Sequence, residues 1–332
     1  MGKKDRLPVS CDEDGVAALQ FHLNMPIFDR YYARIDAHMT AAQGLDHDAP
    51  AGEPDTAAVM RKLMLELSLG DIRLPSFPDI AVRVQKVLDD PKASPARVAV
   101  VVGSEAALAA RIIRLANSAF LNPSGEQISD LRVALTRLGV QLVRCTAVSF
   151  ALQQMKLGGN DAALRGALQE LWRNGALVAS IAYVLARETK AANPDEALVT
   201  GLMHNIGKLY IMTTPRAGDM PTATEAWTDA VREWHPKIAV SILKHWRFPP
   251  AIVAAVGLQN SKDREGSGED GLTDILVAAT VLVPCVFDRN MLSDIVVAVP
   301  AFQRLKMGAD DCKRILAASA EQIRSLRAGL SD

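Results

Sequence analysis

The chain has 332 residues, of which 49% are hydrophobic, and its 37 Lys and Arg against 38 Asp and Glu leave a formal net charge of -1. This composition excludes a disordered protein, because the apolar residues can bury one large core or two modest ones. It also excludes a strongly basic protein of the kind that coats nucleic acid or an anionic membrane along its whole surface.

Cysteine usage and the N-terminus indicate the compartment. The four cysteines lie far apart and show no Cys-x-x-Cys spacing, so we expect reduced thiols. The start Met1-Gly2-Lys3-Lys4-Asp5-Arg6 is charged and is not followed by an apolar signal core. No apolar run approaches the roughly 20 residues that a membrane span needs. We therefore expect a cytoplasmic protein without a membrane partner.

The first 70 residues are predicted to be a helical extension with a linker. Residues 27–35 carry apolar side chains at near-helical spacing, which favours a docking helix over an independent fold in so short a piece. Residues 46–55 lack large apolar side chains and contain Pro50, Gly52 and Pro54, which is typical of a linker.

Beyond residue 74 the pattern is helical almost throughout. Helices are expected at 79–88, from Ser94-Pro95 to Val102, at 106–119, at 129–138, at 140–152 beyond Gly139, at 164–190, from Asp195 through His204, at 229–244, and at two or three places after residue 272, including 310–326. Strand-like alternation is confined to 294–299. The predicted fold class is therefore all-α, a multi-helix bundle in two packed halves.

Several motifs together resemble the HDOD domain. The first half carries Leu74-Pro75-Ser76-Phe77-Pro78, Asp90-Pro91, the stretch Arg-Leu-Ala-Asn-Ser at 114–118, and Ala-Leu-Thr-Arg-Leu-Gly at 134–139. The second half carries Trp172-Arg173-Asn174-Gly175, the segment around His204, and 235–260. The resemblance implies an HD-like helical fold, with an HDOD domain at 71–265 and a C-terminal helical segment at 266–332. HDOD domains resemble catalytic HD phosphohydrolases but usually have an eroded metal site, and they serve bacterial signalling proteins as output or scaffold modules.

Residues 201–209, Gly-Leu-Met-His-Asn-Ile-Gly-Lys-Leu, are similar to the segment that carries the metal-binding His-Asp pair of HD phosphohydrolases. Asn205 stands at the Asp position, Asn174 stands where a His would follow the Trp, and Gln259-Asn260 stand where a His-His pair would follow. An amide is neutral and binds transition metals weakly. The resemblance therefore implies no catalytic residue, no metal ligand and no cofactor.

Three side chains near this motif admit more than one interpretation. His204 could be a surviving ligand, a small-molecule contact or a hydrogen-bonded core histidine, and the last is favoured because a lone imidazole seldom holds a metal. His235 is expected to open or stabilise a helix at 238–244. Lys208, four residues after His204, would face the same side of one helix and could neutralise phosphate, although a solvated or salt-bridged side chain is favoured.

A possible interaction face contains Arg111, Arg114 and Asn117. With Arg132, Arg137 and Arg144 these arginines could bind phosphate, but pairing with Asp and Glu inside the fold is favoured. Asn117 could contact a ligand in a cleft or terminate its helix, and both interpretations stay open.

We expect a non-enzymatic bacterial signal-transduction module that binds a signalling protein as its partner. Its vestigial pocket, which could take a small nucleotide, would be formed by Asn174, His204, Asn205, Lys208, His235, Gln259 and Asn260. One alternative is an HD-type phosphohydrolase acting on a nucleotide or cyclic dinucleotide, which metal content would reveal. The other is a nucleotide- or nucleic-acid-binding module, whose affinity would fall steeply with salt.

Overall fold

The computed structural model describes residues 60–65, 79–118, 121–122, 124–154, 162–213, 225–261, 271–286, 290, 292–318, 320–321 and 324. Every regular element in these ranges is a helix, which confirms the predicted all-α fold class. The expected docking helix at 27–35 and the linker at 46–55 lie outside them.

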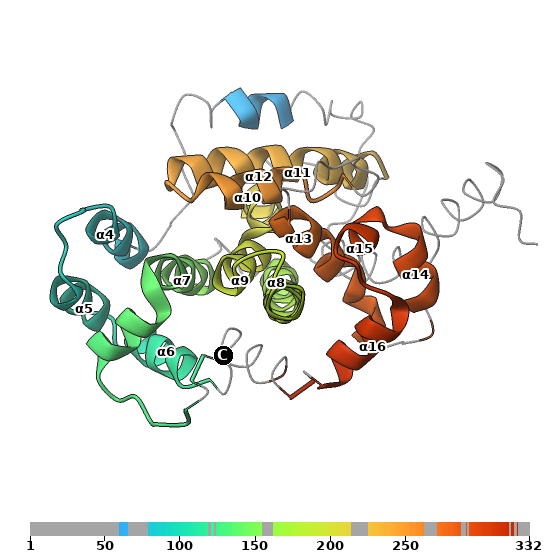
Figure 1. Ribbon diagram of the computed structural model, residues 1–332. Helices are drawn as coiled ribbons and strands as arrows, with labels where there is room; N and C mark the ends of the chain where they lie inside the picture. Colours follow the sequence, from blue (N-terminus) through green and yellow to red (C-terminus); the bar gives the residue numbers. More distant parts are fainter. Residues whose placement is uncertain are drawn as a thin grey trace, which may run out of the picture.

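The helices form the two halves and a C-terminal group (Figure 1). The first half contains α4 (Asp79–Leu88), α5 (Pro95–Gly103), α6 (Ala106–Ala116) and α7 (Leu131–Gln154). The second half contains α8 (Ala162–Thr189), α9 (Pro194–Met203), α10 (Ile206–Thr213), α11 (Glu225–His245) and α12 (Pro250–Gly257). The C-terminal group contains α13 (Gly271–Leu282), the 3-10 turn η2 (Pro284–Val286), α14 (Leu292–Ala298), α15 (Pro300–Arg304) and α16 (Ala309–Ala318). Residues 294–299, whose alternation resembled a strand, are largely helical in α14.

Capping residues set the starts of α5 and α9 where the sequence predicted them. The Ser94 hydroxyl accepts a hydrogen bond from the Arg97 backbone N–H at 3.3 Å, and Pro95 occupies the first helical turn. The Asn193 side chain accepts from the backbone N–H groups of Asp195 and Glu196 ahead of α9. Such caps satisfy backbone donors that have no partner inside the helix.

Gly139 divides α7 as expected, because its backbone lies at φ 71° and ψ 166°, a conformation that glycine adopts readily. The stretch Leu131–Ala151 is long and apolar enough to cross a membrane by length and composition. However, 67% of an 18-residue segment within it is buried inside the protein. A broken and mostly buried helix of this kind is typical of a protein core.

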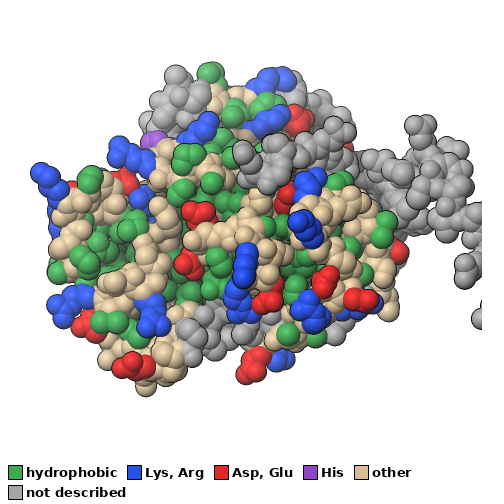
Figure 2. All heavy atoms as spheres, viewed as in Figure 1, with side chains coloured by type: hydrophobic (Ala, Val, Ile, Leu, Met, Phe, Trp, Pro, Cys, Tyr) green, Lys and Arg blue, Asp and Glu red, His purple; other side chains and the backbone are tan. Residues whose placement is uncertain are grey.

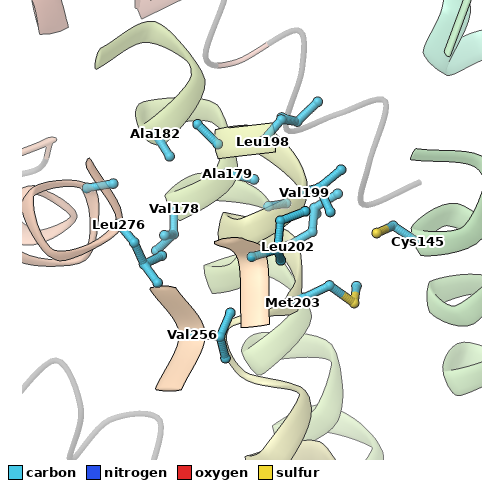
Figure 3. Packing of buried hydrophobic residues seen from close by; sticks show 14 of the residues in the cluster. Cys145, Val178, Ala179, Ala182, Leu198, Val199, Leu202, Met203, Val256 and Leu276 are labelled. Atoms are coloured by element: carbon cyan, nitrogen blue, oxygen red, sulfur yellow. The ribbon is translucent and has the colours of Figure 1, made fainter. Parts of the chain in front are cut away.

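The centre of the molecule is the contact between α8 and α9 (Figures 1 and 3). Side chains of both helices meet Val256 of α12, Leu276 of α13 and Cys145 of α7 in one buried cluster. A Cβ on Gly201 would overlap the backbone of Ala179, so only glycine allows α9 to approach α8 this closely. The cluster places the end of α9 deep inside the fold.

The C-terminal group packs on the same core. Helix α13 contacts α8, α9 and α12, and α16 contacts α8. A two-pronged salt bridge from Arg304 to Asp274, at 2.9 and 2.7 Å, fixes α15 to α13. Residues 271–318 therefore bury side chains together with the two halves.

One buried arginine joins the two halves. The Arg144 side chain on α7, 4% exposed, donates to the Asp89 carboxylate after α4 and to the Trp246 carbonyl after α11, both at 2.9 Å. Its guanidinium also lies 5.9 Å from the centre of the Phe248 ring. We call these contacts the Arg144 bridge. They agree with the expectation that the arginines pair inside the fold.

Candidate functional site

The structure brings most of the predicted pocket residues together from four segments. Helix α8 supplies Asn174, the junction between α9 and α10 supplies His204 and Asn205, α11 supplies His235, and the end of α12 supplies Gln259 and Asn260. We call these residues the amide cluster. All of them are buried except Asn260, which is exposed.

The helix expected from Asp195 through His204, with Lys208 on the same face, is divided in the structure at His204 and Asn205. Helix α9 ends at Met203, His204 is its C-cap, and α10 begins at Ile206. At this break the His204 carbonyl accepts a hydrogen bond of 3.0 Å from the Gln259 side chain. Helical spacing alone therefore does not decide which side Lys208 faces, and the two side chains lie close enough for Lys208 to lower the pKa of His204.

Asn205 and Asn174, two of the predicted pocket residues, form an amide pair. Nδ2 of Asn205 donates to Oδ1 of Asn174 at 3.1 Å, across 31 residues of sequence. Both groups are neutral and buried, so each satisfies part of the other's hydrogen-bonding capacity. The pair fastens the α9–α10 junction to α8.

Gln259 fastens the same junction to α12. Its Nε2 donates to the His204 carbonyl at 3.0 Å and to the Val256 carbonyl at 2.9 Å, which occupies both amide hydrogens. The Gln259 side chain therefore ties the carbonyl at the junction of α9 and α10 to the residues that follow α12.

His204 is a neutral core histidine in this environment. Its Nδ1 lies 2.6 Å from the Gly201 carbonyl, and because a carbonyl only accepts, Nδ1 carries the proton. Burial lowers the pKa of His204 to about 4, the hydrogen bond to Gly201 opposes that shift, and nearby Lys208 adds to it. The ring is therefore uncharged at neutral pH.

His235 lies inside α11, so of the two expected roles it does not open a new helix at 238, but it belongs to the helix that contains residues 238–244. The next residue, Pro236, has no N–H, so the Arg232 carbonyl loses its usual partner four residues later. Nδ2 of Asn260 donates to that carbonyl at 2.8 Å and lies 3.5 Å from Nε2 of His235. Asn260 thus supplies the hydrogen bond that the backbone of Pro236 cannot donate.

The surroundings of His235 keep its ring neutral. Burial is the main cause that lowers the pKa of His235 well below its ordinary value, and Lys208 and His204 contribute in that order. Nδ1 of His235 has no hydrogen-bond partner in the described part of the chain. Below this residue, a Cβ on Gly207 would overlap the His235 carbonyl, so glycine is needed for α10 to approach α11.

Sequence reasoning missed the roles of Gly207, Pro236 and Arg232. A signal existed for two of them, because a proline inside a predicted helix implies an orphaned carbonyl four residues earlier. No local signal indicates that Asn260 supplies the replacement donor, since that contact spans 28 residues.

The donor set does not fit a divalent transition metal. Across the described ranges, no three His, Cys, Asp or Glu side chains gather where they could hold an ion. The amide cluster offers the imidazoles of His204 and His235 beside amides that already bind protein groups. Protein metal sites of this class use three or four imidazole, thiolate or carboxylate ligands.

The predicted face of Arg111, Arg114 and Asn117 does not form one exposed surface. Arg111 is 3% exposed, whereas Arg114 faces solvent. Nδ2 of Asn117 donates to the carbonyls of Ile113 and Ile128, and its Oδ1 accepts from the Ile128 N–H. Asn117 therefore terminates α6 and holds the following loop, which supports the capping interpretation over the cleft.

Comparison with protein families finds a match to the HDOD domain over residues 74–261. No curated protein matches the chain.

Solved structures with this fold include a candidate metal-dependent phosphohydrolase from Shewanella amazonensis SB2B, with 26% identity, a TM-score of 0.61, and coverage of 83% of this chain and 99% of that one. An HDOD domain protein with unknown function from Geobacter sulfurreducens has 23% identity, a TM-score of 0.54, and coverage of 83% and 98%. A candidate signal transduction protein from Marinobacter aquaeolei VT8 has 19% identity, a TM-score of 0.50, and coverage of 84% and 67%.

Proposed function

This chain belongs to the HDOD family, and we propose that it is a non-enzymatic, cytoplasmic signalling module that binds a partner protein. The amide cluster, in this proposal, is a structural network at the centre of the binding module. It needs no cofactor, and the two halves of the domain together present the binding surface.

The observation that carries this proposal is the hydrogen bond between Asn205 and Asn174. An HD phosphohydrolase needs a carboxylate and imidazoles at these places, because they must balance the charge of the ion and orient a water molecule. Here the amides are engaged with each other, and Gln259 and Asn260 are engaged with backbone carbonyls. The cluster is thus committed to holding helices together.

The names of similar proteins support a signalling role only in general terms. One of them is called a signal transduction protein and another a phosphohydrolase. The second name supports the enzymatic alternative for that protein. The donor set of this chain supports the non-enzymatic one, and fold likeness by itself assigns neither.

The catalytic part of the proposal is tested with Asn205→Asp in the full chain. We expect no metal-dependent turnover of a cyclic dinucleotide or a phosphomonoester by the parent or by this variant, because one restored carboxylate leaves the remaining ligand positions as amides. Elemental analysis of the purified parent should also find no stoichiometric transition metal. One metal per chain that is lost in His204→Ala, or turnover above background by either protein, would overturn this part.

The binding part is tested by capture with the tagged full chain, followed by reconstitution of each captured protein in pure form. A version lacking residues 1–55 provides the comparison for the N-terminal extension. We expect at least one protein to form a saturable complex with the HDOD domain. Absence of any saturable complex with the purified candidates would contradict the proposal.

A further inference from the structure

A shallow groove lies on the first segment of α7, away from the amide cluster. It encloses about 560 Å³ and is lined by Asp130, Arg132, Val133, Thr136 and Arg137. This volume falls in the range of sites that hold a few side chains of a ligand. Helix α6 packs beside α7 in this half of the molecule (Figure 1).

The groove has an apolar wall that faces water. Val133, the apolar residue of the lining, is 51% exposed. Val133, Thr136 and Arg137 have the spacing that places side chains on one face of a helix. An apolar side chain of a partner would therefore find contact area on Val133 next to a cation.

The two arginines of the groove differ in whether a carboxylate neutralises them. Arg132 pairs with Asp130 at 3.1 Å, and hydrogen bonds from Arg132 keep the pKa of the Asp130 carboxyl below its ordinary value, so this pair is neutral as a whole. Arg137 has no carboxylate partner among the described residues. Its Nη1 donates to the Leu121 carbonyl at 3.3 Å and to Oδ1 of Asn122 at 3.0 Å.

These two bonds orient the Arg137 guanidinium without neutralising it. The two bonds use both hydrogens of Nη1. The N–H groups of Nε and Nη2 form the other edge of the guanidinium and take no part in these bonds. That edge has the geometry that accepts both oxygens of one carboxylate. The groove thus combines a fixed carboxylate-binding edge with an exposed apolar side chain.

We propose that this groove docks a short amphipathic segment of a partner protein, with an Asp or Glu carboxylate on Arg137 and an apolar side chain against Val133. The inference rests on the proposed partner-binding function and gives that function a location and a chemistry. The partner segment is acidic where it meets α7.

A nucleic acid fits these observations less well. Binding to a phosphate backbone requires several uncompensated cations, and its strength scales with their number. In this half, Arg97 pairs with Asp90 and Arg132 pairs with Asp130. Within the groove, Arg137 is therefore the cation that no described carboxylate compensates. On the face shown in Figure 2, basic and acidic side chains are interspersed without a broad field of one sign.

The test measures binding of three fluorescent probes to the full chain. The probes are an amphipathic peptide with leucines at helical spacing and glutamates between them, the same peptide with lysines for glutamates, and a 20-base-pair DNA duplex. Arg137→Glu and Val133→Asp alter the groove. Lys244→Glu on α11 and Val297→Asp on α14 are matched controls on exposed residues, Val297 being 68% exposed.

We expect the acidic peptide to bind more tightly than the basic one by at least about tenfold, and each groove variant to weaken it by about tenfold while the controls stay within about twofold. Melting temperatures establish that the variants are folded, and Val133→Asp removes no hydrogen bond, so it remains informative if Arg137→Glu disturbs the loop. Equal binding of both peptides, or unchanged binding by folded groove variants, would overturn the proposal. DNA binding that is stronger than peptide binding and lost in Arg137→Glu would assign the groove to nucleic acid and overturn it too.

Partner capture separates this proposal from the proposed function. If the parent forms a saturable complex with a purified partner and both groove variants form it equally well, the docking site is elsewhere and the function stands. If the parent forms no complex at all, the function itself fails. Loss of the complex in both groove variants, with the controls unchanged, is the result that we expect.

Discussion

Replacing Arg144 by Met should loosen the contact between the two halves of the protein. Arg144 holds the Asp89 carboxylate and the Trp246 carbonyl, each at 2.9 Å. Loss of a hydrogen bond from a charged donor costs about 1.5–3 kcal/mol. Asp89 is 32% exposed and can be hydrated, so the loss of its ion pair with Arg144 adds less than about 1 kcal/mol. Met keeps much of the apolar contact of the arginine stem.

Two opposing effects set the expected total. The Nε atom of Arg144 is buried and has no hydrogen-bond partner among the described residues, so its removal relieves part of the penalty. We therefore expect a loss of about 2 kcal/mol in the free energy of unfolding, because the lost hydrogen bond to the Trp246 carbonyl outweighs the relief.

Urea denaturation of Arg144→Met and of Arg144→Met with Asp89→Asn measures this loss. The double variant should be little worse than the single one, since both remove the same ion pair. A single variant as stable as the parent would refute the reasoning, because the Arg144 bridge would then contribute nothing to the junction of the halves.

Three further outcomes follow from the amide cluster and the core. His204→Ala should lower the melting temperature, at a cost of about 1–3 kcal/mol for unsatisfied partners, and leave partner binding per folded molecule intact; lost binding at an unchanged melting temperature would contradict this. Stability should fall between pH 6.5 and about 4, because the folded pKa of His204 is about 4 and the unfolded chain binds the proton first; urea midpoints at pH 7 and 5 should differ in the parent and differ less in His204→Ala. Gly201→Ala should destabilise the protein by about 1–3 kcal/mol, since the new methyl group meets the Ala179 backbone; circular dichroism melting curves that superimpose on the parent would count against it.

Local rules in the sequence predicted the boundaries of several helices. Ser94-Pro95 marked the start of α5, and Gly139 marked the division of α7, because a side chain that caps a helix or a backbone with positive φ acts on its immediate neighbours. The presence of amides at Asn174 and Asn205, where the family resemblance implies metal ligands, could also be predicted, because it concerns residue identity alone.

Contacts between distant segments could not be predicted from these local rules. The division between α9 and α10 at His204 coincides with a donor from Gln259, which is 55 residues away. The Trp246 carbonyl that Arg144 holds is 102 residues away, so the location of the bridge depends on the packing of the whole fold. For this reason, helical spacing in the sequence could not place Lys208 relative to His204.

The pairing of Asn205 with Asn174 also determines what the chain requires from its surroundings in order to fold. At position 205, which is 4% exposed, an ionised carboxylate would need a positive ion or a basic side chain to offset its desolvation. Proteins built with such ligands gain folding free energy from the ion, and they lose it when the ion is scarce. The amide pair is neutral, so it needs no counter-ion. We therefore expect the folded state of this chain to be independent of metal supply, so chelators should leave its population unchanged.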